Sequence, residues 1–327
     1  MLSNLFSTNR RVSGLLGASL IALSVALTSC KDEENPVTTP TPQTITQLVT
    51  SNSQFTLLSA AVNRAGLGTT LSGAGPFTVF APNDAAFRAA GFADAAAINA
   101  VPVATLTNIL LYHVVSGSVA SSAIPAGQTA QPTALTANGT AYVSKATSTS
   151  GTGVSINGAR VVQADVQASN GVVHVIDRVL MPPAGNILAV AQSDTTLSYL
   201  VAAAQRGGTA VTTALGGTTA LTVFAPTNAA FRAAGFPTIA AINAAPVATL
   251  TNILTYHVVP GVRAYSPTLT NGASITTFQT GTVTVGVTSS GVTVLGKGNG
   301  TNASNVTTPD ISATNGVIHK IDRVLLP

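Results

Sequence analysis

The sequence predicts an α+β fold that is built twice along the chain. In each copy, helical periodicity fills the first half, and alternating β-branched stretches fill the second half, a segregation typical of α+β domains. The stretch "TVFAPNDAAFRAAGF" at Thr78 returns 144 residues later, at Thr222, as "TVFAPTNAAFRAAGF". A repeat this long is a whole domain rather than a solenoid unit. We therefore expect two tandem domains, at 43–183 and 184–327.

Helices are expected in the first half of each copy. In the first copy, three apolar residues fall on one helical face: Phe55, Leu58 and Val62. After a buried strand at 76–81, Asn83 or Asp84 can cap a short helix that ends at Gly91. Pro102 suits the first turn of another helix. The apolar face of that helix repeats at intervals of three and four residues, at Leu106, Ile109, Leu110 and His113.

Strands are expected in the second half of each copy. Residues 140–146 and most of 153–182 alternate and are rich in β-branched side chains. The pair Asn170-Gly171 within the second stretch is typical of a tight hairpin turn. The same pair returns at Asn315-Gly316, so the second copy should form the same hairpin.

Composition limits the classes of function. Of 327 residues, 46% are hydrophobic, which is enough to fill two cores, and only 7% are charged. The formal net charge of +4 comes from Lys and Arg that are scattered along the chain. Nucleic-acid binding needs a concentrated basic face, so we expect no nucleic-acid partner. A single cysteine excludes an intrachain disulfide, and packing alone must hold each domain together.

The first thirty residues are expected to direct export. Arg10 and Arg11 precede an apolar stretch at 14–27 that is too short for a comfortable transmembrane helix. It ends in "LTSC", which resembles a bacterial lipobox, where the signal is cut before a lipidated cysteine. Cys30 is the only cysteine in the chain and stands at that position. We therefore expect a lipoprotein signal peptide at 1–29 and a lipid anchor on Cys30, whose acyl chains would hold the protein stably at a membrane.

The lipidated Cys30 and a short spacer should occupy 30–42, with the spacer after the cysteine. It begins with the acidic run "KDEEN", which resembles a signal that sends lipoproteins to the outer face of the cell, although a plain solvated charge run is the alternative. The Pro- and Thr-rich residues after it favour extended chain. The expected location is thus the outer membrane, facing the exterior, with the lipid anchor as the contact with the membrane.

Three motifs resemble those of one domain family. The block "TVFAPNDAAF", the pair Tyr112-His113, and "NGVVHVIDRVLMP" from Asn170 resemble the two characteristic blocks and the central Tyr-His of the fasciclin (FAS1) domain. The second copy matches in the same three places, with Tyr256-His257 as its pair. The resemblance implies two tandem fasciclin-like domains, each a β-strand wedge or sandwich packed with several α-helices. It also implies a role in adhesion or matrix contact rather than catalysis.

The sequence offers little catalytic or metal-binding chemistry. There is no G-x-S-x-G motif, and His174 and Asp177 lie three apart on an expected strand, so they point to opposite faces. Asp177-Arg178 is expected to form a structural charge pair within its domain. The chain has no H-x₃-H, cysteine pair or acidic calcium loop, which leaves only a site bridging His113 and His174 open. We expect no enzyme activity and no cofactor.

Two roles are open for Tyr112, His113, Tyr256 and His257. Each histidine falls on the apolar face of its helix, where a buried, neutral imidazole could join helix to strand. The family resemblance implies instead that the Tyr-His region takes part in receptor contact. A tyrosine can serve both roles, because its ring packs while its hydroxyl reaches a surface.

The expected function is that of a surface-anchored, non-enzymatic cell-adhesion or matrix-interaction lipoprotein. Its partner would be a cell-surface or matrix protein or a glycan. The loop expected at 296–310 could be a variable contact loop. An alternative is an extracytoplasmic carrier of a small apolar ligand such as a carotenoid or lipid, because some fasciclin-like proteins bind such ligands.

Overall fold

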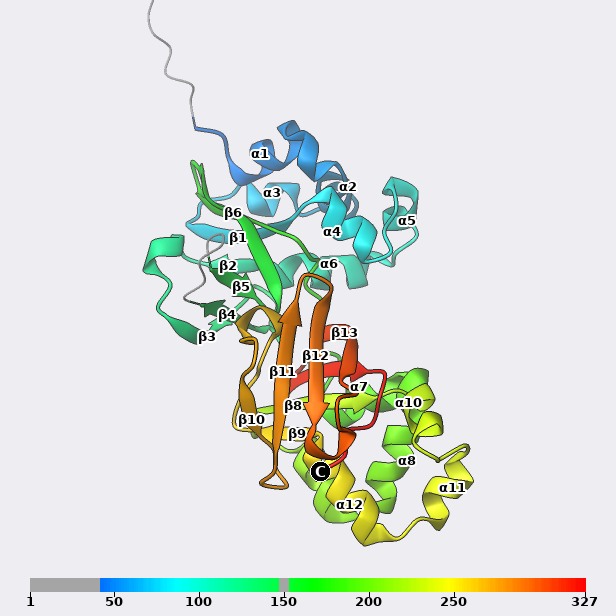
Figure 1. Ribbon diagram of the computed structural model, residues 1–327. Helices are drawn as coiled ribbons and strands as arrows, with labels where there is room; N and C mark the ends of the chain where they lie inside the picture. Colours follow the sequence, from blue (N-terminus) through cyan, green and yellow to red (C-terminus); the bar gives the residue numbers. More distant parts are fainter. Residues whose placement is uncertain (1–41, 147–152) are drawn as a thin grey trace, which may run out of the picture. The chain divides into compact units, whose positions relative to one another are not determined.

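The computed structural model describes residues 42–146 and 153–327, which belong to one compact unit (Figure 1). The expected signal peptide, Cys30, the acidic run and nearly all of the spacer lie outside the described residues. The lipid anchor and the export route therefore remain predictions.

The first domain combines short helices with a seven-stranded sheet. Its helices are α1 (Ile45–Ser51), α2 (Thr56–Ala65), α3 (Gly68–Leu71), α4 (Asp84–Ala89), α5 (Ala95–Asn99) and α6 (Val103–Tyr112), with 3₁₀ turns at Ser53–Phe55 and Ser121–Ala123. Its strands are β1 (Phe77–Pro82), β2 (Val114–Ser116), β3 (Gly127–Pro132), β4 (Thr140–Lys145), β5 (Val154–Ile156), β6 (Ala159–Ala168) and β7 (Gly171–Ile176). The strand order is β2-β1-β7-β6-β5-β4-β3.

Local capping sets several of these helix ends. Thr44 and Gln47 form a capping box at the start of α1. Asn83, not Asp84, caps α4, since its side chain accepts from the Ala86 amide at 2.9 Å. Asp84 instead accepts from the Leu57 amide, so it ties the start of α4 to α2.

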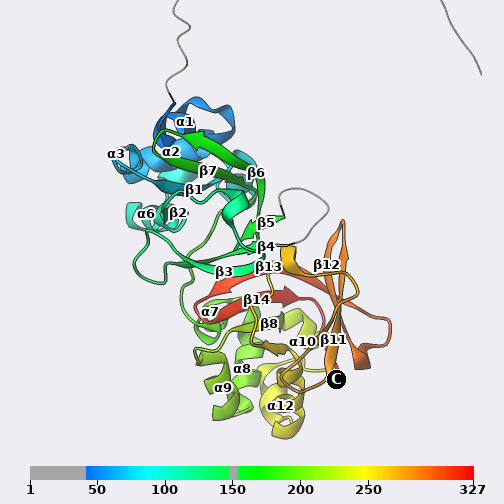
Figure 2. The same ribbon diagram turned by 90° about the vertical axis from the view of Figure 1, so that its left-hand side faces the viewer.

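Strand β1 divides the first domain into two cores. Val79 and Ala81 face the helices, whereas Phe80 points to the opposite side, into a cluster with residues of β4, β5 and β6. Figure 2 shows the helices α1, α2 and α3 beside β1 and β7, with β3 to β5 farther along the sheet. The first domain is thus a wedge of strands with helices packed on one side.

The central strands are parallel, and a hairpin leads into them. β1 pairs in parallel with β7, with Val79 opposite Val173. β6 and β7 form the expected hairpin, in which Ala168 pairs with Gly171 across a two-residue turn. The turn thus lies one residue earlier than the Asn170-Gly171 pair suggests. The register of β6 also shifts before Val166, which marks a β-bulge.

The second domain repeats this plan. Its helices are α7 (Ile187–Ser193), α8 (Ser198–Arg206), α9 (Thr209–Gly216), α10 (Asn228–Ala233), α11 (Ile239–Ala244) and α12 (Val247–Tyr256), with 3₁₀ turns at Thr195–Leu197, Ser266–Thr268 and Lys297–Asn299. Its strands are β8 (Leu221–Pro226), β9 (Val258–Pro260), β10 (Ser274–Thr276), β11 (Thr282–Thr288), β12 (Gly291–Gly296), β13 (Ser304–Ala313) and β14 (Gly316–Ile321). The strand order is β10-β11-β12-β13-β14-β8-β9.

The α+β expectation is confirmed in both domains, and one local expectation is wrong. Residues 296–310 were expected to be a loop, but they hold the 3₁₀ turn at Lys297–Asn299 and most of β13, which begins at Ser304. The stretch looked loop-like because it is rich in Gly, Asn and Thr. Pairing of β13 with β12 and β14 overrides that local preference.

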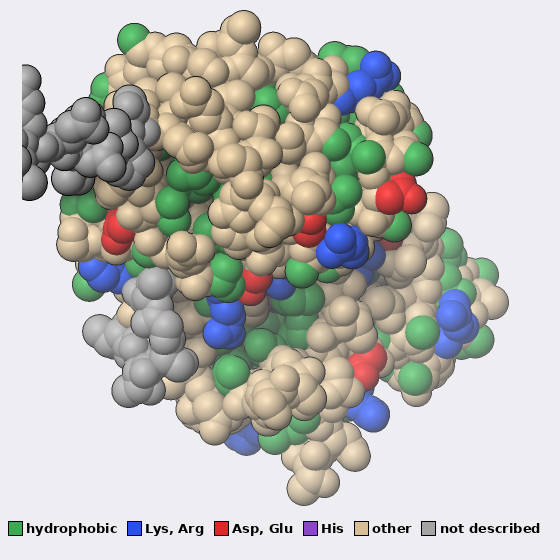
Figure 3. All heavy atoms as spheres, turned by 90° about the horizontal axis from the view of Figure 1, so that it is seen from above, with side chains coloured by type: hydrophobic (Ala, Val, Ile, Leu, Met, Phe, Trp, Pro, Cys, Tyr) green, Lys and Arg blue, Asp and Glu red, His purple; other side chains and the backbone are tan. Residues whose placement is uncertain are grey.

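The described surface is weakly charged. On the face drawn in Figure 3, basic and acidic side chains lie scattered among uncharged ones. In the part of the chain that the structure describes, no single helix is long and apolar enough to cross a membrane. The helices Ile187–Ser193 and Thr195–Arg206 meet that test only when taken together, and they bend by 104°.

Candidate functional site

The Tyr112-His113 pair lies where α6 passes into β2. His113 is the C-terminal capping residue of α6 and is only 2% exposed. Its Nδ1 lies 2.7 Å from the carbonyl oxygen of Ile109, one turn back in the helix. Its Nε2 accepts from the Leu180 amide at 2.9 Å. Because an amide can only donate, Nε2 carries no proton and the imidazole is the neutral Nδ1–H tautomer.

This imidazole joins the two cores of its domain. Ile109 packs in the helical core, whereas Leu180 packs in the core on the other side of β1. Burial lowers the pKa of His113 from 6.5 to about 4, and the bond to Ile109 opposes that change only in part. His113 is therefore neutral near pH 7 and acts as a two-ended backbone bridge.

His257 repeats the arrangement in the second domain. Its Nδ1 donates to the carbonyl oxygen of Ile253 at 2.8 Å, and its Nε2 accepts from the Leu325 amide at 2.9 Å. Burial likewise lowers the pKa of His257 to about 4. Both domains thus have a histidine at this junction, because its ring donates a hydrogen bond from one nitrogen and accepts a hydrogen bond at the other.

The tyrosines are buried beside the histidines. Tyr112 is 1% exposed, and its hydroxyl donates to the Thr140 carbonyl oxygen at 2.9 Å while accepting from Asn157 Nδ2 at 2.7 Å. Burial raises the pKa of Tyr112 to about 12. Tyr256 is equally buried; its hydroxyl donates to the Thr282 carbonyl oxygen at 2.5 Å and accepts from the Lys297 amide at 2.9 Å.

All four side chains of the Tyr-His pairs thus lie inside the fold. Of their two open roles, this burial favours the structural one, because an approaching protein would meet neighbouring residues first. Each hydroxyl fixes a sheet strand against a helix end, and each imidazole fixes the segment that follows the last strand of its domain. A contribution to receptor contact would be indirect, through the surface that they support.

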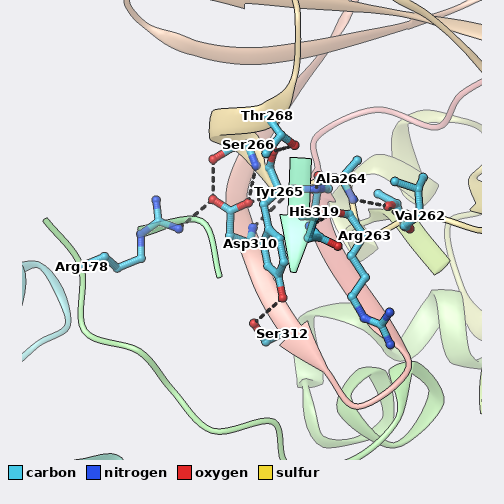
Figure 4. Close-up of polar contacts among 12 residues, drawn as sticks. Arg178, Val262, Arg263, Ala264, Tyr265, Ser266, Thr268, Asp310, Ser312 and His319 are labelled. Carbon is cyan, nitrogen blue, oxygen red and sulfur yellow. Dashed lines mark hydrogen bonds and ion pairs between the residues drawn. The ribbon is translucent and has the colours of Figure 1, made fainter. Parts of the chain in front are cut away.

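A second pair of buried histidines, His174 and His319, lies in a second set of hydrogen bonds in the two domains. His319 Nε2 donates to the Ala264 carbonyl oxygen at 2.9 Å, and its Nδ1 accepts from the Asp310 amide at 3.2 Å (Figure 4). The Asp310 carboxylate accepts from the Ser266 amide at 2.6 Å and from the Ser266 hydroxyl. Burial lowers the pKa of His319, whereas the nearby Asp310 charge acts in the opposite direction.

The first domain holds the same constellation. Asp165 accepts from the Ser121 amide at 2.8 Å and from its hydroxyl, and its own amide donates to His174 Nδ1. The bonds from Ser121 hold the pKa of Asp165 below its usual value. Asp165 and Asp310 sit in the bulges of β6 and β13 with φ of 58° and 65°. The spacing in the sequence could have indicated this arrangement, because an aspartate lies nine residues before a histidine in both copies.

The expected charge pair between Asp177 and Arg178 within one domain is wrong. Asp177 accepts from the Arg160 amide at 2.7 Å, and the Arg178 guanidinium instead lies 2.9 Å from Asp310 of the second domain (Figure 4). Asp322 accepts from the Asn305 amide and side chain. Each of these carboxylates accepts from a backbone amide near the start of the neighbouring strand. Its position next to an arginine in the sequence therefore does not indicate its partner.

The constellations do not provide a catalytic pair. Ser266 donates to Asp310 rather than to an imidazole, and His319 has both nitrogens bonded to backbone groups. A nucleophile would need a nearby base to take its proton. Across residues 42–146 and 153–327, no three His, Cys, Asp or Glu side chains lie close enough to hold a metal ion. The possible bridge between His113 and His174 fails because both nitrogens of each ring already have backbone partners.

Comparisons with known proteins give one family model and several similar proteins. The profile of the Fasciclin domain matches residues 53–182 and 195–327. Protein sll1483 of Synechocystis sp. is 37% identical over 171 residues, which cover 51% of this chain and 90% of that protein. Transforming growth factor-beta-induced protein ig-h3 of Sus scrofa is 31% identical over 259 residues, covering 79% of this chain and 35% of that protein. A FAS1 domain pair from the insect cell adhesion molecule Fasciclin I aligns with 86% of this chain and 95% of that one, at a TM-score of 0.41 and 20% identity.

Proposed function

Because the chain belongs to the fasciclin domain family, with one domain in each half, we propose that it is a surface-anchored, non-enzymatic lipoprotein for cell adhesion or matrix contact. Fasciclin domains are associated with adhesion and matrix interaction in homologues, and members of the family are generally non-enzymatic. The partner would be a protein or glycan of a cell surface or matrix.

The observation that carries the proposal is the tandem of two fasciclin domains whose polar side chains serve the fold. The four histidines are all buried, and each bridges backbone groups. The described surface offers uncharged polar groups and scattered charges, which suit broad, weak contact rather than chemistry on a bound substrate. Weak contact sites gain strength when several act together on one surface.

Anchoring supplies the second part of the proposal. Lipidation of Cys30 would tether the chain, and the Pro- and Thr-rich spacer would hold the domains away from the membrane. Several copies on one cell would then face the same partner surface. The acidic run after Cys30 is what supports exposure on the outside of the cell.

The test measures retention of bacteria that make the protein on surfaces coated with matrix protein or glycan under flow. Cells that make wild-type protein should be retained more than cells that make Cys30→Ala, because the variant cannot be lipidated at that position. Protein amounts are matched by immunoblot. Equal retention by both strains and by a strain lacking the protein would contradict the proposal.

A further inference from the structure

The second domain contains a cavity beside His257 with a volume of about 220 Å³. Helices α7, α8, α9 and α12 enclose it against the inner face of β8 and β14. Its walls include Leu200, Leu215, Val223, Leu254 and Ile318. The cavity lies wholly within one domain. His257 lines it, whereas Tyr256 and the partners of its hydroxyl do not.

The cavity offers little to a polar or charged ligand. No charged side chain lines it. His257 has partners at both nitrogens, and the Thr255 hydroxyl donates to the Thr251 carbonyl oxygen at 2.8 Å. Water needs two or more polar partners to settle in a buried space, so an apolar cavity of this kind stays dry.

The cavity arises where the second domain has smaller side chains than the first. Ala191, at the fifth position of α7, corresponds to Val49 in α1. Ala204, at the seventh position of α8, corresponds to Val62 in α2. Both valines are 2% exposed and help to fill the helical core of the first domain. Two alanines in their place leave fewer side-chain atoms to fill the space between the helices. An unfilled cavity of this kind lowers the stability of the domain.

An exposed aromatic side chain stands at the cavity. Phe278 lines it and is 53% exposed, so this ring reaches from the cavity to the solvent. Its amide donates to the Val258 carbonyl oxygen at 2.7 Å, as the Ala134 amide does to Val114 in the first domain. The second domain thus has a phenyl ring where the first has a methyl group, and the ring extends the apolar surface outward.

We propose that the second domain binds a compact, uncharged, hydrocarbon-like molecule in this cavity, a site that adhesion does not require. An apolar cavity of about 150 Å³ accepts a benzene-sized ligand, so this one suits a molecule of roughly ten carbons in one or two rings. Burying a charge here would leave it without a partner, which excludes ionised ligands. An extended carotenoid exceeds the cavity, whereas a bicyclic hydrocarbon matches it.

Naphthalene is the probe, and 2-naphthoate is its charged counterpart. Protein comprising residues 31–327 is purified without detergent, and binding is measured by calorimetry and by the shift in Tm. We expect one naphthalene per chain, a raised Tm, and binding of 2-naphthoate at least about tenfold weaker because its carboxylate would be desolvated. Absence of naphthalene binding, or equal affinity for 2-naphthoate, overturns the proposal.

Variants locate the site. Ala191→Val combined with Ala204→Val gives the second domain the first domain's residues and should weaken naphthalene binding at least about tenfold, because the added methyl groups occupy the cavity. Val262→Ala, at a 41% exposed position that does not line the cavity, is the matched control and should bind as wild type does. Unchanged affinity in the filled variant overturns the proposal.

If circular dichroism shows that the double variant is misfolded, single variants provide the test. Ala204→Val alone should lower affinity, and Phe278→Ala should lower it without changing the cavity walls behind it. Wild-type affinity in both would overturn the assignment. Because the adhesion assay uses no hydrocarbon, failure here leaves the adhesion proposal standing, and failure there leaves this one standing.

Discussion

Acid should destabilise the protein through its buried histidines. The pKa of His257 is about 4 in the folded domain and 6.5 when the chain is unfolded. Between these values the unfolded chain binds a proton that the folded domain does not. Stability is therefore complete above pH 6.5 and is lost as the pH falls from 6.5 toward 4. The difference amounts to about 3 kcal/mol for this histidine, at about 1.4 kcal/mol per pH unit.

The first domain should respond in the same window, because burial lowers the pKa of His113 to the same value. The assay is urea unfolding at pH 7, 6, 5 and 4, followed by circular dichroism, with the free energy of unfolding extrapolated to water at each pH. His319 acts in the same direction in the second domain, since burial lowers its pKa as well.

A variant isolates the contribution of one imidazole. His257→Gln removes the titrating group, so the second domain should lose part of its pH dependence between 6.5 and 4 even though it is less stable at pH 7. The Asp165 carboxylate, whose pKa lies below its usual value, acts only at lower pH. A free energy of unfolding that stays constant from pH 7 to 4.5 in the wild type would refute the reasoning. A pKa of His257 near 6.5, measured by NMR titration, would also refute it.

Three further predictions concern packing and anchoring. His257→Ala should destabilise the second domain by about 2 to 4 kcal/mol, more than Tyr256→Phe, because it leaves a cavity and two unpaired backbone groups; equal, negligible losses in urea unfolding would contradict this. Proteins comprising 43–183 or 184–327 should each unfold cooperatively, since each holds its own core clusters; disordered spectra from both would show a shared core. Cys30→Ala should move the protein from the membrane to the soluble fraction and abolish uptake of labelled fatty acid, and a variant that stays membrane-bound would refute the anchor.

The general architecture could be predicted because local patterns specify it. The apolar spacing that ends at His113 indicated both the helix and the buried face on which the imidazole lies. The hairpin before β7 followed from Asn170 and its glycine neighbour. What no local pattern supplies is a distant partner, because Leu180 lies 67 residues from His113 and Ser121 lies 44 residues from Asp165.

Two features depend on packing and could not be foreseen from either copy alone. The cavity requires Ala191 and Ala204 to face the same space, which only the assembled helices determine. Strand β13 requires pairing on both sides to order a Gly- and Asn-rich stretch that resembles a loop. The residues responsible for the cavity and for the ordered strand are visible in the sequence. Their consequences become visible only when residues far apart in the chain pack together.

The central claim is that two fasciclin domains act together as contact sites on one anchored chain. It is tested by beads coated at equal molar density with residues 31–327 or with an equimolar mixture of 43–183 and 184–327. Adhesion is measured as the force needed to detach beads from a matrix-coated surface, after circular dichroism shows that each protein is folded. Linked sites raise avidity by about 10² to 10⁴ when both reach the partner surface, so the joined form should detach at clearly higher force. Equal detachment of the joined and mixed beads would contradict the claim.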